Sequence, residues 1–203
     1  MTFSFTEGHS DPTVQPVPAS VVQQVDAADT TLSNPRRAVI SIGANLGNRL
    51  ETLQGAIDAL EDTPGVRIKA VSPVYETVPW GVDPESQPSY FNAVVVLKTT
   101  LPPSSLLERA HAVEEAFHRV REEHWGARTI DVDIVAYADV VSDDPVLTLP
   151  HPRAHERAFV LAPWHDVEPE AQLPGRGAVA ALLDAVTRDG VAPRKDLELR
   201  LPE

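Results

Sequence analysis

The sequence contains no cysteine, which excludes disulfide bonds, thiolate metal sites and cysteine nucleophiles. It also lacks any apolar run approaching the roughly 20 residues that a membrane-spanning helix needs. Its first residues, MTFSFTEGHSDPTVQPVP, have neither the basic start nor the apolar core of a secretory signal. Together these absences predict a protein with no membrane partner that works in the reducing cytoplasm.

Basic residues are scarce, with 17 Lys and Arg against 30 Asp and Glu and a formal net charge of -13. Because a nucleic-acid backbone is itself negative, we expect no nucleic-acid partner. The basic groups are nevertheless clustered, since five of the seven histidines and five arginines fall within residues 111–157. Such a concentration inside an acidic protein indicates a local pocket for an anion. Guanidinium groups suit bidentate contacts with phosphate.

The first 36 residues differ from the rest of the chain in composition. They are rich in Pro, Ser, Thr, Asp, Gln and Val, with no sustained period of 2 or 3.6. Such a segment buries too little apolar surface to order itself. We therefore predict a disordered N-terminal extension over residues 1–36 and one folded domain over residues 37–203.

From residue 38 the apolar residues recur regularly. Alternating or β-branched runs predict strands over residues 38–43, 67–75, 91–99 and 130–137. Helical spacing predicts one helix after the first strand and another beginning near Pro103, where Ser105 and Glu108 are spaced as a capping box. The resulting order predicts a ferredoxin-like α+β fold, with both helices on one face of an antiparallel sheet. Beyond residue 138 we expect a loop-rich C-terminal part with a short helix over residues 179–186.

Asp131 and Asp133 stand two residues apart in the last of these strands, so both carboxylates point to the same face. Two buried like charges are unfavourable unless a cation lies between them, and Mg2+ bridging a polyphosphate is the usual one. On an exposed strand, however, the same pattern is simply solvated. Arg128 nearby, with the clustered arginines and histidines, favours the metal hypothesis. The opposite face of this strand is expected to be core, formed by Val132, Ile134 and Ala136.

Two further segments carry polar groups whose function stays open. The second helix has a stripe formed by His111, Glu114, His118 and Arg121, which is compatible with a zinc site, a solvated face or a substrate-facing edge. Residues 43–47 (GANLG) join a strand to a helix, but no Walker motif is present. We therefore interpret them as a tight turn, which leaves phosphate binding to arginine, histidine and metal.

Aromatic and imidazole groups suggest where a flat substrate binds. Residues 150–159 form a proline-pinned loop with two histidines, two arginines and Phe159. This combination fits an aromatic substrate beside a phosphate chain, although a buried histidine can merely hydrogen-bond the backbone. Tyr90 offers a ring face, and Asn92 offers both donor and acceptor to a heterocycle. Strand packing and a turn cap are the alternatives for these two residues.

Taken together, these motifs resemble those of the 6-hydroxymethyl-7,8-dihydropterin pyrophosphokinase family. They follow the family's order and spacing over about residues 38–175, and the most specific is WGARTIDVD at 125–133. The others are SIGANLG (41–47), YETVPWG (75–81), QPSYFN (87–92), RVR (119–121) and LPH (149–151). The resemblance implies the ferredoxin-like fold and transfer of diphosphate from Mg-ATP to the hydroxymethyl group of a reduced pterin. That reaction releases AMP and belongs to folate biosynthesis.

The resemblance also implies roles for individual residues. Those implied to be catalytic are Arg119, Arg128, Asp131 and Asp133, with the two aspartates holding two Mg2+ ions. Those implied to bind ATP are His111, Glu114, Arg121, Trp125, Thr148, His151 and Arg157. Those implied to bind the pterin are Thr77, Pro79, Trp80, Tyr90, Asn92 and Phe159, with Tyr90 and Phe159 enclosing the ring. The expected partners are these small molecules, and the expected state is a monomer able to associate with other folate enzymes.

The sequence departs from relatives near the expected nucleotide contacts, at His111, His124, Val146 and Pro152. Two other functions are compatible with a ferredoxin-like fold. One is a non-catalytic module that binds a small regulatory molecule, which would not need the aspartates and arginines together. The other is a metal-dependent phosphoesterase, which would need an activated water that the sequence does not place.

Overall fold

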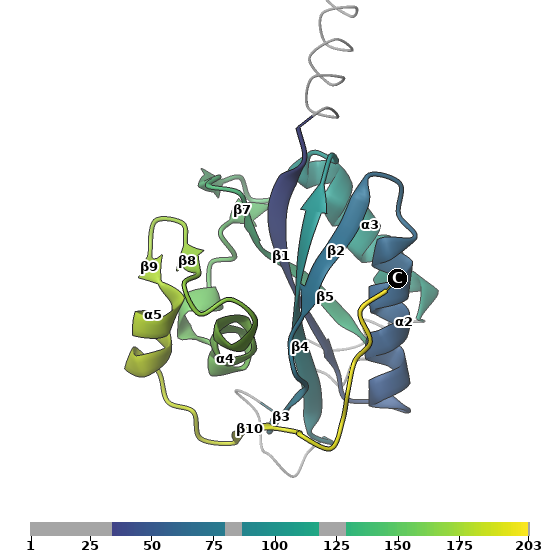
Figure 1. Ribbon diagram of the computed structural model, residues 1–203, viewed down its shortest axis with the longest axis vertical. Helices are drawn as coiled ribbons and strands as arrows, with labels where there is room; N and C mark the ends of the chain where they lie inside the picture. The colour runs from purple at the N-terminus through teal and green to yellow at the C-terminus, as the bar shows by residue number, and fades with distance from the viewer. Residues whose placement is uncertain (1–33, 80–86, 118–128, 203) are drawn as a thin grey trace, which may run out of the picture.

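A computed structural model describes residues 34–79, 87–117 and 129–202. Its main sheet contains six strands, and Figure 1 shows helices on both sides of it. The strands are β1 (Arg36–Ala44), β2 (Val66–Val71), β3 (Tyr75–Thr77), β4 (Tyr90–Thr99), β5 (Asp131–Tyr137) and β10 (Val191–Pro193). The helices are α2 (Arg49–Glu61), α3 (Pro103–Ala116), the 3-10 helix η1 (Ala154–Glu156), α4 (Ala158–Val167) and α5 (Val179–Ala185).

The sheet confirms the ferredoxin-like plan. Its strands run in the order β10-β3-β4-β1-β5, β2 also pairs with β4, and every pairing is antiparallel. Helices α2 and α3 cover one face, where Leu53 and Leu106 belong to the same buried core as Ile40 and Ile42 of β1. The two inner strands β4 and β1 have side chains in cores on both faces of the sheet, which explains their nearly continuous apolar sequences.

The other face of the sheet is covered by a helix that the sequence analysis assigned to loop. Helix α4 packs against β4, and its Leu161 and Trp164 join Val39 and Val94 in a second core. The helix was missed because Pro163 lies inside it and because it is apolar on nearly all sides, so no helical period is visible. Helix α5 was predicted over residues 179–186 and is found at Val179–Ala185.

Two small hairpins complete the C-terminal part of the chain. They are formed by β6 (Ser142–Asp143) with β7 (Thr148–Leu149), and by β8 (Gln172–Leu173) with β9 (Gly177–Ala178). The last strand, β10, joins the edge of the main sheet by pairing with β3. None of the described helices combines the length and apolarity needed to cross a membrane.

The strand predicted over residues 67–75 is divided into β2 and β3. Pro73, which has no N–H to donate, lies between them. The ladder continues there through a side chain, because the Val94 N–H donates to Ser72 Oγ at 2.8 Å while the Ser72 N–H donates to the Val94 carbonyl at 2.9 Å. The chain therefore stays attached to β4 but is free to turn, and β3 continues along β4 from Tyr75.

One local prediction is wrong, and another is confirmed only in part. The expected capping box of α3 is absent, since Pro102 occupies the N-cap position and no side chain caps the helix. Ala136 is buried in a core as expected, but not in the same core as Val132 and Ile134, because the β1–β5 register shifts at Val39/Ile40 and leaves Val135 unpaired with β1. As a result both Val135 and Ala136 pack in the second core.

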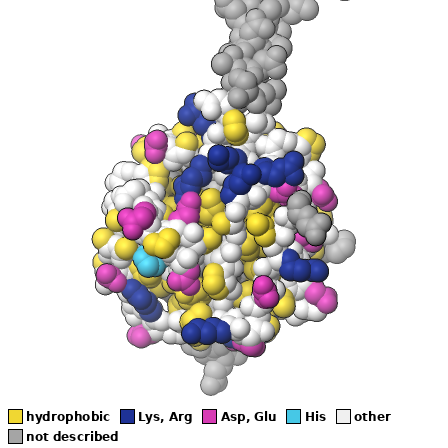
Figure 2. Space-filling model, in the orientation of Figure 1, with side chains coloured by type: hydrophobic (Ala, Val, Ile, Leu, Met, Phe, Trp, Pro, Cys, Tyr) yellow, Lys and Arg dark blue, Asp and Glu magenta, His cyan; other side chains and the backbone are white. Residues whose placement is uncertain are grey.

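Figure 2 shows the same face of the molecule with its side chains. Basic side chains gather in the upper part, over the region where β1, β2 and β4 lie in Figure 1. Exposed Arg67 and Lys98 are direct partners across β2 and β4, and Arg67 is ion-paired with Glu61. Neither Arg67 nor Lys98 is among the residues predicted to bind phosphate.

Candidate active site

One row of residues across three strands organises the site. Gly43 of β1 lies opposite Asn92 of β4 and also opposite Asp131 of β5. Directly opposed residues in antiparallel strands project to the same face, so Asn92 and Asp131 face the same side with Gly43 between them. Neighbouring strands lie roughly 4.8 Å apart, so the Asn92 and Asp131 backbones are about 10 Å apart. Asp133, opposite Ser41, projects to this face as well.

Gly43 lies inside β1, as the strand predicted over residues 38–43 requires, but β1 continues to Ala44, so the turn predicted over residues 43–47 begins later than expected. A Cβ placed on Gly43 would lie 2.7 Å from Asn92 Oδ1, so no side chain fits there without moving the asparagine. The turn itself uses Gly47, whose φ of 65° suits glycine, and Asn48, whose side chain caps α2 by accepting the Glu51 N–H. Gly43 therefore keeps the floor of the site open between Asn92 and Asp131.

Asp133 faces two cationic or proton-donating groups from the loop that follows β7. Its Oδ2 lies 3.9 Å from His151 Nε2 and 3.7 Å from Arg157 Nη1. The Arg157 side chain is only 16% exposed, so its charge is poorly screened by water. The structure thus brings together the predicted metal ligand and two residues predicted to bind ATP.

His151 is held at both its backbone and its ring. Its N–H donates to the carbonyl of the bulged Val135 at 2.9 Å, and its Nδ1 accepts the Arg153 N–H at 3.1 Å. Burial, reinforced by the positive charge of Arg157, lowers the pKa of His151 to about 4. The ring is therefore neutral at pH 7, and because Nδ1 is an acceptor, the proton resides on Nε2. His151 thus offers an Nε2–H donor on the side of Asp133.

A cavity of about 250 Å³ opens beside β5, between α3 and the β6–β7 hairpin. Its lining includes both aspartates and four of the residues predicted to bind ATP, namely His111, Glu114, Thr148 and His151. Val146 also lines the cavity and is 78% exposed. Thr148 hydroxyl donates to the Asp144 carbonyl within the hairpin.

Glu114 is buried rather than part of a solvated stripe. It is 3% exposed, and its Oε1 accepts the Val132 N–H of β5 at 2.9 Å. The carboxylate therefore joins α3 to the strand that carries Asp131 and Asp133. His111, three residues earlier on the same helix, is exposed. One side of α3 thus provides both an anchor and a wall of the cavity.

Three of the residues predicted to bind the pterin, Thr77, Tyr90 and Asn92, lie on the same face of β3 and β4. Thr77 and Asn92 are both buried, and Asn92 Nδ2 donates to Thr77 Oγ1 at 2.8 Å. Tyr90 is partly buried, with its hydroxyl 3.3 Å from Gln87 Oε1. Pro79 is buried, and Phe159 lies in the first turn of α4 with the Arg157 guanidinium 5.5 Å from its ring centre.

Five of the predicted site residues lie outside the described part of the chain: Trp80, Arg119, Arg121, Trp125 and Arg128. Their roles remain predictions drawn from the family resemblance. His118, from the possible zinc stripe, and His124 also lie outside it.

The metal-ligating side chains of the described residues suit Mg2+ better than a metal whose ligands must all come from the protein. Within the described ranges, no group of three or more His, Cys, Asp or Glu residues is placed to hold a metal. Mg2+ needs only one or two carboxylates, because substrate phosphates and water supply the remaining oxygens. Asp131 and Asp133, on one face and at the wall of the cavity, meet that requirement.

Fold and site together define a class of protein: a ferredoxin-like α+β protein with a pair of carboxylates, Asp131 and Asp133, at the wall of a small cavity. The family model described as 7,8-dihydro-6-hydroxymethylpterin-pyrophosphokinase (HPPK) matches residues 39–169. The chain belongs to this family.

Relatives and solved structures agree with this membership. The 2-amino-4-hydroxy-6-hydroxymethyldihydropteridine pyrophosphokinase of Mycobacterium leprae is 42% identical over 172 residues, covering 76% of this chain and 87% of its own. The Pseudomonas aeruginosa protein of the same name is 39% identical over 156 residues, covering 77% and 95%. The crystal structure of wild-type HPPK-DHPS from Plasmodium falciparum has a TM-score of 0.61 at 16% identity, covers 75% of this chain and 44% of its own, and supports the fold alone.

Proposed function

We propose that this protein transfers the diphosphate group of Mg-ATP to the hydroxymethyl group of 6-hydroxymethyl-7,8-dihydropterin in folate biosynthesis. Family membership supports this reaction, and the observation that carries it is the Asn92–Gly43–Asp131 row. The row sets a buried polar pocket and a carboxylate pair on one face at a separation of about 10 Å. A pterin at Asn92 therefore has its hydroxymethyl group directed along the open floor toward phosphate at the carboxylates.

The pterin is bound by polar groups that hydrogen-bond its edge and by aromatic rings that stack on its faces. Buried Thr77 and Asn92 meet the heterocycle's donors and acceptors, and an unpaired polar group there is costly, which gives specificity. Tyr90 and Phe159 enclose the ring, and Pro79 and Trp80 complete the pocket. Because ring faces are apolar and the edge is polar, stacking and hydrogen bonding act on different parts of the same ligand.

The triphosphate is bound on the β5 side. Asp131 and Asp133 hold two Mg2+ ions, which when bound neutralise phosphate charge. The His151 Nε2–H and the Arg157 guanidinium donate to phosphate oxygens near Asp133. Arg121, Trp125, His111, Glu114 and Thr148 complete the nucleotide site.

In the reaction, the hydroxymethyl oxygen bonds to the β-phosphorus of ATP while the bond from that phosphorus to the bridging α-phosphate oxygen breaks. The hydroxyl proton is released to solvent, AMP leaves, and the pterin carries the diphosphate. Arg119 and Arg128 offset charge on the transferring group, and most of the rate comes from holding the two substrates in line.

Location and assembly follow as part of the same proposal. We infer a cytoplasmic monomer that uses ATP and a reduced pterin as small-molecule partners and associates with other folate enzymes. Size-exclusion chromatography with light scattering tests the monomer.

Product analysis tests the reaction. The protein is mixed with Mg2+, ATP and 6-hydroxymethyl-7,8-dihydropterin, and the products are separated by chromatography. We expect AMP and the pterin diphosphate in equal amounts. Formation of ADP or free phosphate without pterin diphosphate would contradict the proposal and favour a phosphoesterase or a module that has lost this chemistry.

A further inference from the structure

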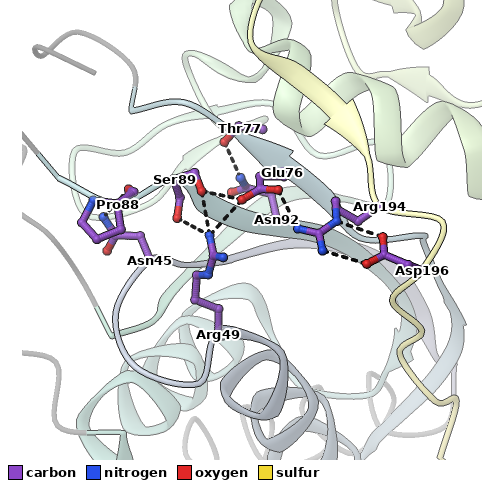
Figure 3. Close-up of polar contacts among 9 residues, drawn as sticks. All are labelled: Asn45, Arg49, Glu76, Thr77, Pro88, Ser89, Asn92, Arg194 and Asp196. Carbon is purple, nitrogen blue, oxygen red and sulfur yellow. Dashed lines mark hydrogen bonds and ion pairs between the residues drawn. The ribbon is translucent and has the colours of Figure 1, made fainter. Parts of the chain in front are cut away.

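A second network of charges lies on the opposite face of the sheet from Thr77 and Asn92. The Glu76 carboxylate accepts from Ser89 Oγ at 2.6 Å and Arg49 Nη1 at 3.3 Å through Oε1, and from Arg194 Nη1 at 2.6 Å through Oε2. Figure 3 shows the three donors converging on it from α2, from the start of β4 and from the C-terminal segment. Hydrogen bonds from Ser89 and the two arginines keep the pKa of Glu76 below its usual value despite partial burial. The group is therefore ionised at neutral pH.

This network stands directly behind the proposed pterin pocket. Glu76 is opposite Phe91 in the β3–β4 ladder, while their chain neighbours Thr77 and Asn92 project to the other face. Thr77 and Asn92 are joined by their own 2.8 Å hydrogen bond. A shift of β3 against β4 would separate these two side chains, so whatever holds Glu76 to β4 also holds the pocket.

Two guanidinium groups contact the Phe91 ring, and one of them also binds Ser89, the residue before β4. Arg49 lies 3.6 Å and Arg194 5.3 Å from the Phe91 ring centre, and that residue is 6% exposed. Arg49 Nη1 also donates to the Ser89 carbonyl at 2.7 Å. The residue before Tyr90 is thereby tied to α2 through both its backbone and its side chain.

The position of Arg49 is unusual for an arginine. It is the first residue of α2, where the helix dipole disfavours a positive side chain. Its guanidinium is directed away from the helix to Glu76 and Ser89, as Figure 3 shows. A residue that breaks a local preference in this way is expected to serve a contact made elsewhere.

The C-terminal segment brings the third donor. Val191, Ala192 and Pro193 of β10 pair with Thr77, Glu76 and Tyr75, in that order. The Arg194 N–H then donates to the Val74 carbonyl at 2.8 Å. Further on, the Arg200 backbone exchanges two hydrogen bonds with the Gln54 side chain of α2. The segment thus forms a strap from β3 to α2, with Arg194 directed inward at Glu76.

We propose that Glu76, clamped by Arg49, Ser89 and Arg194, is a positioning residue that sets the Thr77–Asn92 pair for pterin binding. This inference rests on the proposed function, because it takes the pterin pocket from there. Glu76 touches no substrate and acts through the register and spacing of β3 and β4. A merely stabilising ion pair would lower the melting temperature without distinguishing the two substrates.

The test compares Glu76→Gln and Arg194→Gln with matched controls. Lys195→Gln makes the same charge change one residue from Arg194, on an exposed side chain. Glu168→Gln breaks another partly buried carboxylate–arginine pair that joins distant parts of the chain, Arg37 with Glu168, outside the pocket. For each variant we measure kcat, KM for each substrate and melting temperature. The Kd of the pterin is also measured with Mg2+ and a non-hydrolysable ATP analogue.

We expect Glu76→Gln and Arg194→Gln to raise KM and Kd for the pterin about 5- to 10-fold, with KM for ATP changed by less than about 2-fold. Lys195→Gln should match wild type, and Glu168→Gln should lower the melting temperature alone. If the Glu76 and Arg194 variants behave like Glu168→Gln, or weaken both substrates equally, the positioning role is wrong. A wild-type protein that neither binds nor converts the pterin overturns the proposed function itself and, with it, this inference.

Discussion

The backbone of Gly43 and the side chain of Asn92 are in such close contact that a Cβ on Gly43 would lie 2.7 Å from Asn92 Oδ1. Real Cβ contacts are essentially never so short, and Asn92 is buried and hydrogen-bonded to Thr77, so it has little room to move. The absence of a side chain at Gly43 thus fixes the position of the Asn92 amide, which is proposed to bind the edge of the pterin. The glycine is required here for space rather than for an unusual φ.

Gly43→Ala should therefore weaken pterin binding by displacing Asn92. We expect KM for the pterin to rise at least about 10-fold, because small misplacements at a binding site are costly, while KM for ATP changes little. Steady-state kinetics with each substrate varied separately measures this. Gly55→Ala is the matched control, since its Cβ would meet the Phe117 ring at 2.6 Å, but on α2. Equal effects of the two substitutions on the pterin would contradict the role of Gly43.

Asp131→Asn and Asp133→Asn should each lower kcat at least about 100-fold, because each removes a proposed Mg2+ ligand. Binding of the pterin alone should be retained, which calorimetry can measure. Asp139→Asn, on the exposed turn after β5, should leave both properties unchanged. EDTA should abolish wild-type turnover, and added Mg2+ should restore it. Near-normal rates for either variant at ordinary Mg2+ would refute the metal assignment.

Two substitutions of His151 separate its two ring nitrogens. Asparagine places an acceptor where Nδ1 receives the Arg153 N–H, whereas glutamine places an N–H donor near Nε2. If the Nε2–H contacts phosphate, His151→Asn should fold normally yet lose roughly 100-fold in kcat. His151→Gln should be less stable but retain more activity. The reverse order of activities would show that His151 acts through the loop backbone and not through its donor.

Glu168 links the end of α4 to β1, and it should make folding sensitive to acid. Burial acts to raise its pKa, but hydrogen bonds from Arg37 and Trp164 outweigh this and leave the pKa below its usual 4.5. A carboxylate with a lowered folded-state pKa stabilises fully above its unfolded pKa and loses that stabilisation as pH falls through the folded value.

We therefore expect Glu168→Gln to cost about 1–2 kcal/mol at pH 7 and much less near pH 3. Urea unfolding at several pH values measures the difference between the two proteins. Asp184→Asn, which breaks the exposed pair with Arg188, is the control and should cost little at any pH. A cost for Glu168→Gln that does not change with pH would show that packing, not charge, is responsible.

The central fold could be predicted from the sequence because its periods are strong. Strand β4 is a β-branched run, and α2 and α3 show apolar residues at helical spacing, so the ferredoxin-like order was visible. Helix α4 was not, since Pro163 and its uniformly apolar surface remove the signal. The division of the second strand at Pro73 depends on the Ser72 hydroxyl replacing a backbone partner, which only the folded chain shows.

The candidate site was likewise predicted only in part from the sequence. The residues Asp131, Asp133 and His151 were predicted, and the structure places them around one cavity. Gly43 was predicted only as the junction of a strand and a turn, because its close approach to Asn92 appears only when β1 and β4 are paired. The Glu76 network was missed because its members lie at 49, 76, 89 and 194 and share no local pattern. A glutamate within a short strand and an arginine at the first position of a helix were the available signals.

The strap also sets an order of assembly during synthesis. Strand β5, which carries Asp131 and Asp133, and the loop with His151 leave the ribosome well before β10 and Arg194. A nascent chain that already has its nucleotide side therefore still lacks one of the three groups holding Glu76. The proposed pterin pocket therefore reaches its final form only after β10 has paired with β3 and Arg194 has reached Glu76.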